Sequence, residues 1–133
     1  MPFAEFTDGL RVGHEEIDHQ HATLFDAVNR LHGALRTGRS REEQGGILSF
    51  LRSYTVDHFQ MEETYMKEKG YPGLESHRVL HHALIEQVME LEDKYAAGSM
   101  TLSIMTMHFL KDWLTNHIQN EDRKLAVFLR ANP

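Results

Sequence analysis

The chain contains no cysteine, only three prolines, and no apolar run long enough to cross a membrane. The absence of cysteine excludes disulfides, thiolate zinc sites, iron–sulfur clusters and cysteine nucleophiles. Basic residues are also few, 14 against 20 acidic ones, and the net charge of −6 argues against general nucleic-acid binding, which needs a basic surface. The N-terminus lacks the basic and apolar stretches of a signal peptide, so we expect a cytoplasmic protein without a transmembrane segment.

The length of 133 residues corresponds to one domain, and the content of 41% hydrophobic and 26% charged residues is typical of a folded globular protein. The prolines stand at positions 2, 72 and 133, so most of the chain is free of the strongest helix breaker. We therefore expect a single domain over residues 1–133, with an N-terminal arm over 1–17 and a helical bundle over 18–130.

Apolar residues recur at helical spacing in four segments that are separated by three glycine-containing turn signals. The expected helices cover residues 19–36, 41–69, 74–97 and 101–130. Because the links between them are short, neighbouring helices should run antiparallel. The sequence therefore predicts an all-α fold, an antiparallel up-down-up-down four-helix bundle.

Several residues are typical of helix ends. Asp18 and Thr101 are candidate N-caps of the first and fourth helices. Ser40 begins the string Ser-Arg-Glu-Glu, which fits a capping box at the start of the second helix. Gly70, followed closely by Pro72, is expected to end that helix.

Histidine is unusually abundant, with ten residues, and half of them fall on the expected inward faces of the helices. On the third helix, two histidines four residues apart replace leucines in the apolar seam, so both imidazoles leave the same face. A histidine and a glutamate have the same spacing on the second helix. The inward-facing set is His21, His58, Glu62, His77, His81 and His117.

Residue counts from the turns place these side chains at one level of the bundle. His21 lies about 18 residues before the first turn and His58 about 19 after it, which at ~1.5 Å per residue is a mismatch of only a few ångströms. His81 and His117 are related in the same way across the third turn. Buried polar groups need partners, and a bound cation satisfies all of them at once. We therefore expect a metal centre.

The ligand types narrow the choice of metal. Imidazole and carboxylate donors without sulfur favour iron, zinc, copper, nickel or manganese over calcium or magnesium. Six or seven ligands exceed what one tetrahedral zinc accepts, whereas two metals that share carboxylates would use them all. A histidine-rich pair of metals inside a bundle points toward iron that handles a small molecule.

The ordered set of motifs over four helices resembles the hemerythrin family along nearly the whole chain. Each motif alone is common, but their order and spacing together are highly specific. The matching stretches are Val12-Gly13 through Asp18-His19-Gln20-His21, His58-Phe59-Gln60-Met61-Glu62-Glu63, His77-Arg78-Val79-Leu80-His81, and Trp113-Leu114-Thr115-Asn116-His117-Ile118 with Asp122.

This resemblance implies a non-haem centre of two iron ions joined by an oxo or hydroxo bridge. The implied terminal ligands are the five inward histidines, and the implied bridging carboxylates are Glu62 and Asp122. Three histidines would complete six ligands on one iron, and two histidines would leave an open position for O₂ on the other. The implied function is reversible O₂ binding for carriage, storage or delivery, with an oxygen-using enzyme as a possible recipient.

Helix geometry and the resemblance disagree at one ligand. Four residues after His117 stands Glu121, whereas the resemblance selects Asp122, which in a regular helix lies about 140° away from the direction of His117. Asp122 therefore requires a local irregularity such as a π-type turn. We follow the resemblance and predict Asp122 as the ligand.

An apolar pocket is expected around the open iron, lined by Trp113, Leu114 and Phe25, which lie one turn from ligand histidines. Such a wall slows the entry of water and the loss of superoxide, although all three residues also suit an ordinary core. The remaining histidines fit the inward stripes poorly and are expected at the surface or behind the ligands: His14, His19, His32, His82 and His108.

Other functions at the same centre stay open from sequence alone. They are oxygen or redox sensing, turnover of peroxide or nitric oxide, and iron binding without O₂ chemistry. A sensor needs an output domain, and the bundle occupies the 133 residues, which favours a carrier that is not an enzyme. A ferritin-like centre is disfavoured because it needs two Glu-x-x-His strings, and only Glu16 to His19 provides one.

Overall fold

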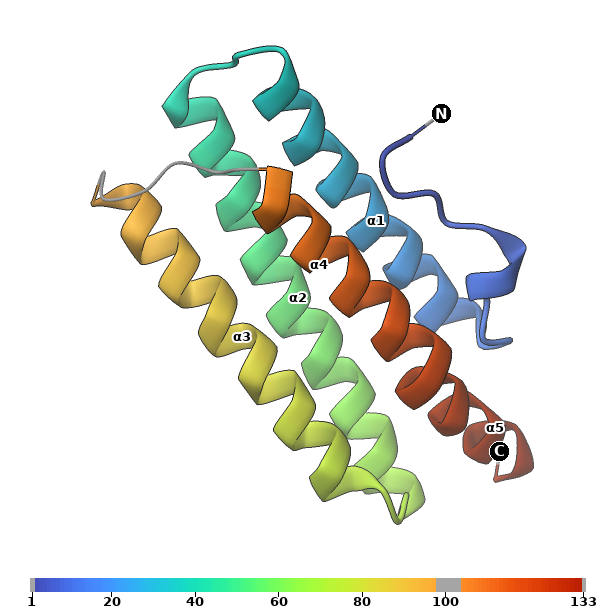
Figure 1. Cartoon of the computed structure of the whole chain (residues 1–133). Coiled ribbons are helices and arrows are strands. Elements are labelled where there is room, and N and C mark those ends of the chain that lie inside the picture. Colours follow the sequence, from blue (N-terminus) through green and yellow to red (C-terminus); the bar gives the residue numbers. More distant parts are fainter. Residues whose placement is uncertain (1, 98–103, 133) are drawn as a thin grey trace.

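A computed structural model describes residues 2–97 and 104–132, and within these the regular elements are helices without any strand. Neighbouring helices run antiparallel, which confirms the predicted all-α up-down-up-down bundle (Figure 1). A 3₁₀ turn, Asp8–Leu10, precedes the first helix, and a π-helical turn, Ile118–Asp122, joins the last two. The α-helices are α1 (Glu15–Arg36), α2 (Arg41–Lys69), α3 (Leu74–Ala96), α4 (Ile104–His117) and α5 (Arg123–Ala131).

The predicted ends of α2 are confirmed. The Ser40 hydroxyl accepts a hydrogen bond from the Glu43 backbone N–H at 3.1 Å, so one of the free N–H groups of the first turn is satisfied. At the other end Gly70 adopts the left-handed conformation with φ 66°, which glycine adopts without steric cost. The predicted N-cap at Thr101 lies outside the described residues.

The predicted start of the first helix is wrong by one turn. Helix α1 begins at Glu15, and its N-cap is His14, whose Nδ1 accepts from the Ile17 N–H at 3.3 Å. Asp18 is instead buried inside the first turn, where its carboxylate accepts from the backbone N–H groups of Val12 at 2.7 Å and Gly13 at 3.2 Å. The carboxylate thus secures the turn before the helix, and the imidazole takes over the capping role.

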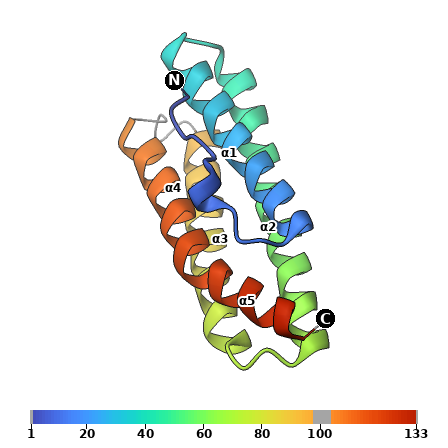
Figure 2. The ribbon, with the colours of Figure 1, turned by 90° about the vertical axis from the view of Figure 1, so that its right-hand side faces the viewer.

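The expected single helix over 101–130 is divided into two by the π-helical turn. Figure 2 shows that α5 bends away from the direction of α4 after this turn and crosses one end of the bundle. The apolar face of α5 packs onto the core through Leu125, Ala126 and Leu129, all of them buried. The bend lets one continuous segment serve as both the fourth wall and part of the floor of the bundle.

The N-terminal segment lies along the bundle and connects α1 to α4 (Figure 2). Ala4 forms two backbone hydrogen bonds with the Asn29 side chain, one donated and one accepted, both at 2.7 Å. The Phe3 ring stacks on His32 of α1 at 4.1 Å and meets the edge of His108 of α4 at 5.1 Å. These contacts give the arm a fixed place on the bundle.

Replacing Asn29 with alanine should destabilise the protein by about 1–3 kcal/mol, because the buried Ala4 backbone loses both partners. Urea denaturation measures this change in the free energy of unfolding. Arg30→Ala is the matched control, since Arg30 is an exposed neighbour on the same helix. Equal stabilities of the two variants would show that the arm contributes nothing.

The core follows the length of the bundle, and within the described residues no helix is long and apolar enough to span a membrane. Its large, fully buried apolar side chains come from α1, α2, α4 and the last turns of the chain. They are Ile17, Leu24, Phe25, Leu31, Leu48, Phe59, Met66, Met107, Ile118 and Leu125. One layer of this core is polar, and it contains the inward histidines.

Candidate metal centre

The structure brings all seven sequence-predicted ligand side chains together in one buried layer. Helix α1 contributes one histidine, α2 a histidine and a glutamate, α3 two histidines, α4 one histidine and the π-helical turn the aspartate. Each of these residues is 6% exposed or less. The cluster consists of His21, His58, Glu62, His77, His81, His117 and Asp122.

The two oxygens of Glu62 face different histidines. Oε2 lies 3.1 Å from His58 Nε2 and 3.5 Å from His21 Nε2, on the side of α1 and α2. Oε1 lies 3.2 Å from His81 Nε2 and 3.5 Å from His77 Nε2, on the side of α3. The carboxylate therefore spans two separate groups of imidazoles.

Asp122 divides its oxygens in the same way. Oδ2 lies 2.9 Å from His21 Nε2, and Oδ1 lies 3.0 Å from His77 Nε2 and 3.3 Å from His117 Nε2. The cluster thus separates into two groups that share both carboxylates, and the ligand atoms within each group lie within 4.8 Å of one another. One group holds His77, His81 and His117, and the other holds His21 and His58.

The π-type turn that a contribution from Asp122 required is present. Residues Ile118–Asp122 form this turn directly after His117, so the wider winding returns Asp122 to the inner face. Glu121, which a regular helix would place there, has a side chain that is 30% exposed and lies 3.9 Å from Lys124 Nζ. The backbone therefore turns Asp122 inward and leaves Glu121 at the surface.

The polar atoms of this layer fit a cation better than they fit one another. Both oxygens of Glu62 and of Asp122 are buried without a hydrogen bond, and so are the Nε2 atoms of His21, His58 and His77. Leaving such groups unpaired is costly in a protein interior. Nitrogen and oxygen donors in two groups, joined by two shared carboxylates, match the preferences of a pair of first-row transition-metal ions.

The electrostatics of the layer keep its carboxylates ionised. Burial and Glu62 raise the pKa of Asp122, but His117 and His21 outweigh them and hold it well below its usual value. The pKa of Glu62 is likewise lowered, against the effect of burial, mainly by His58 and His21. Two adjacent carboxylates that stay charged offer a strong attraction to a divalent or trivalent cation.

The histidines respond to the same charges. Burial lowers the pKa of His21 and of His77, but the carboxylates of Asp122 and Glu62 raise it to about 9 in both. His81 differs, because burial lowers its pKa and the neighbouring imidazoles add to this effect. Without metal, protons partly neutralise the carboxylates, so metal binding must displace protons from the histidines.

Three neighbours of the cluster were not singled out from sequence. The Nδ1–H of His58 donates to Gln20 Oε1 at 2.6 Å, and the Nδ1–H of His81 donates to Glu63 Oε2 at 3.1 Å. The Phe59 ring stacks parallel on His81 with ring centroids 3.6 Å apart. Adjacency to His58 and Glu62 in the sequence was the only available signal for Phe59 and Glu63.

The three residues predicted to line the apolar pocket occupy different environments. Trp113 stacks on His117 with centroids 4.4 Å apart and lies 6.0 Å from Phe59. Leu114 is buried in the turn before His117. Phe25 is also buried, and its described ring contact is with Phe6 of the N-terminal arm, at 5.6 Å.

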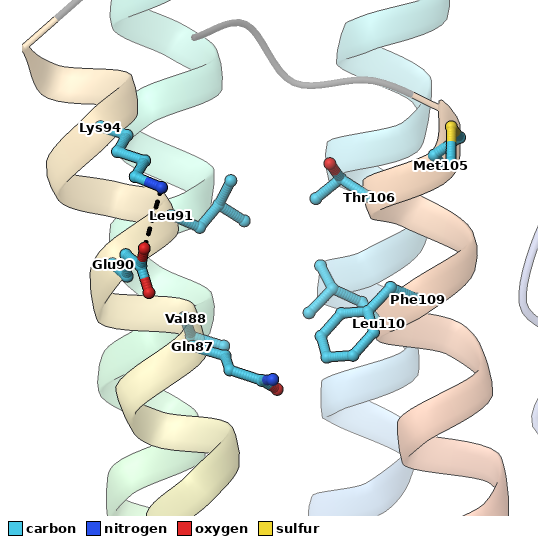
Figure 3. A pocket seen from close by; sticks show the side chains of 9 residues that line it. All are labelled: Gln87, Val88, Glu90, Leu91, Lys94, Met105, Thr106, Phe109 and Leu110. Atoms are coloured by element: carbon cyan, nitrogen blue, oxygen red, sulfur yellow. Dashed lines mark ion pairs between the residues drawn. The ribbon is translucent and has the colours of Figure 1, made fainter. Parts of the chain in front are cut away.

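Two pockets lie between α3 and α4, and only one adjoins the cluster. The larger, of about 380 Å³, is apolar and lies away from the histidine layer, between Val88 and Leu91 of α3 and Phe109 of α4 (Figure 3). The smaller, of about 240 Å³, is lined by Trp113, His117 and polar side chains of the π-helical turn. Trp113 and His117 therefore separate solvent from the cluster.

Comparisons with known proteins agree with this geometry. Residues 12–129 match the family model described as the hemerythrin HHE cation binding domain. The chain is 42% identical over 128 residues to bacteriohemerythrin of Methylococcus capsulatus, covering 96% of this chain and 94% of that protein. It is 28% identical over 117 residues to myohemerythrin of Riftia pachyptila, covering 88% and 86%.

Solved structures give the same result at the level of the fold. A crystal structure of wild-type hemerythrin matches with a TM-score of 0.83 and 39% identity, over 86% of this chain and 88% of that chain. A crystal structure of a hemerythrin point mutant matches with a TM-score of 0.92 and 35% identity, over 97% and 98%.

Proposed function

Since this chain belongs to the hemerythrin family, we propose that its buried histidine layer holds two iron ions and that the loaded protein binds O₂ reversibly. The protein would then carry, store or deliver oxygen and would not be an enzyme. The observation that carries this proposal is the shared use of Glu62 and Asp122 by two unequal groups of histidines.

The two groups define the proposed ligand roles. His77, His81 and His117 hold one iron, and His21 and His58 hold the other. Glu62 and Asp122 bridge the two, since each directs one oxygen toward each group. With an oxo or hydroxo bridge, the three-histidine iron has six ligands, and the two-histidine iron has five and one open position.

A di-iron pair supplies two electrons to O₂ and recovers them when O₂ leaves. The chain's own residues make that exchange reversible by excluding water from the layer. Phe59 covers one face of His81, and Trp113 covers one face of His117 beside the solvent-facing pocket. An apolar wall at this place favours binding of a small neutral molecule over irreversible oxidation of the metal.

An absorption measurement tests reversible binding. The iron-loaded protein is reduced without oxygen, given air and then degassed, and the visible spectrum is recorded at each step. We expect a coloured band that appears with O₂ and disappears on degassing. Immediate, permanent conversion to a ferric spectrum would contradict the proposal and would direct attention to turnover of peroxide or nitric oxide at the same centre.

Replacing Trp113 with alanine should leave the iron content unchanged but accelerate oxidation of the reduced centre severalfold, because the pocket then opens onto His117. The rate of spectral change in air measures this effect. Phe109→Ala is the matched control, since Phe109 is an aromatic residue of the same helix that lines the other pocket. Equal oxidation rates in both variants would exclude a shielding role for Trp113.

A further inference from the structure

The two groups of histidines differ in the charge of the residues behind them. Behind the three-histidine group, His81 donates its Nδ1–H to the carboxylate of Glu63 at 3.1 Å. Behind the two-histidine group, His58 donates its Nδ1–H to the amide oxygen of Gln20 at 2.6 Å. Glutamate and glutamine have nearly the same shape, so the main difference between the two partners is one negative charge.

Glu63 is held in a fixed orientation toward His81. Its second oxygen, Oε1, accepts from Arg78 Nε at 3.3 Å, and Arg78 also reaches Glu75 at 3.4 Å. The His81 ring is fixed from another side by Phe59, which stacks parallel on it. Glu63 itself is only partly exposed, so solvent does not fully screen its charge at the imidazole.

The hydrogen bond fixes what each nitrogen of His81 does. An ionised carboxylate only accepts, so the proton stays on Nδ1 and the lone pair of Nε2 points into the cluster. Sharing that proton with an anion makes the imidazole a more basic ligand, and second partners of this kind commonly change metal affinity 10- to 100-fold. A neutral amide has the same directing effect on His58 with a weaker electronic one.

We propose that Glu63 is a positioning residue that acts through His81 to make the three-histidine iron the more electron-rich of the pair, while Gln20 leaves the two-histidine iron less so. This inference rests on the proposed di-iron function. A more basic ligand stabilises the ferric state, so Glu63 lowers the reduction potential of the centre. It therefore sets how readily the pair gives electrons to O₂.

The test replaces Glu63 with glutamine, which keeps the shape and removes the charge. Two quantities are measured: the reduction potential of the iron-loaded protein, and the affinity of the metal-free protein for Zn²⁺ in competition with a chelator. In E63Q we expect a more positive potential and a Zn²⁺ affinity that is 10- to 100-fold lower. Glu75→Gln is the matched control, because Glu75 contacts Arg78 but is exposed and does not reach His81.

A reciprocal variant covers the case in which E63Q folds poorly. Gln20→Glu adds a charge behind His58 and should shift the potential in the opposite direction, to more negative values. Potentials and Zn²⁺ affinities in E63Q equal to those of E75Q, or an unchanged potential in Q20E, would overturn the inference. A parent protein that takes Zn²⁺ but no iron would overturn the proposed function instead.

Discussion

Replacing Asp122 with asparagine is expected to remove at least one of the two irons from each chain. The variant keeps the size of the side chain but loses the charge that His21 and His77 both face, at 2.9 and 3.0 Å. An amide offers one acceptor oxygen where the carboxylate offers two, so it cannot reach both groups of histidines. Elemental analysis of the purified, iron-loaded protein measures the number of irons per chain.

The matched control is Glu121→Gln, in the same π-helical turn. Glu121 is partly exposed and turned toward Lys124, so its replacement should leave the iron content at two per chain. Full iron content in D122N together with iron loss in E121Q would show that the regular spacing of four residues from His117 identifies the ligand. That result would also remove the reason for assigning a functional role to the π-type turn.

Replacing His77 with alanine should lower the iron content and abolish most of the stabilisation that metal gives to the fold. A ligand that binds only the native state adds about 4 kcal/mol to stability when present at 1,000 times its dissociation constant. For a chain of this size, such a loss lowers the melting temperature by on the order of 10 °C. His77 lies in the buried layer with neither ring nitrogen hydrogen-bonded, so its removal breaks no other hydrogen bond.

Thermal unfolding with and without iron separates this effect from a packing defect. The metal-dependent difference in melting temperature should be large in the parent protein and nearly absent in H77A. His82→Ala provides the control, because His82 is exposed on the same helix, one residue after a ligand position. A metal-dependent difference in H77A equal to that in H82A would exclude His77 as a ligand.

Most of the fold follows from patterns that the sequence displays directly. Inward residues repeat at helical spacing, and Gly70 and Ser40 mark the ends of α2 through local backbone chemistry that involves near neighbours. The start of α1 was wrong because Asp18 is equally suited to two local tasks. Whether it caps the helix or secures the preceding turn depends on the path of the N-terminal arm.

The composition of the histidine layer was also predictable, because residue counts from each turn convert sequence distance into height along the bundle. The partners behind the layer were not. Gln20 and His58 lie 38 residues apart, and their contact depends on the rotation of two helices about their axes. Periodicity defines such rotations too coarsely to tell a hydrogen-bonded glutamine from a surface one.

The central claim, two irons held by seven shared and unshared ligands, is tested most directly by anomalous diffraction at the iron edge from crystals of the loaded protein. The account predicts two peaks inside the bundle. One peak is surrounded by the histidines of α3 and α4, the other by His21 and His58, and both adjoin Glu62 and Asp122. A single peak in this layer, or iron outside it, would contradict the account.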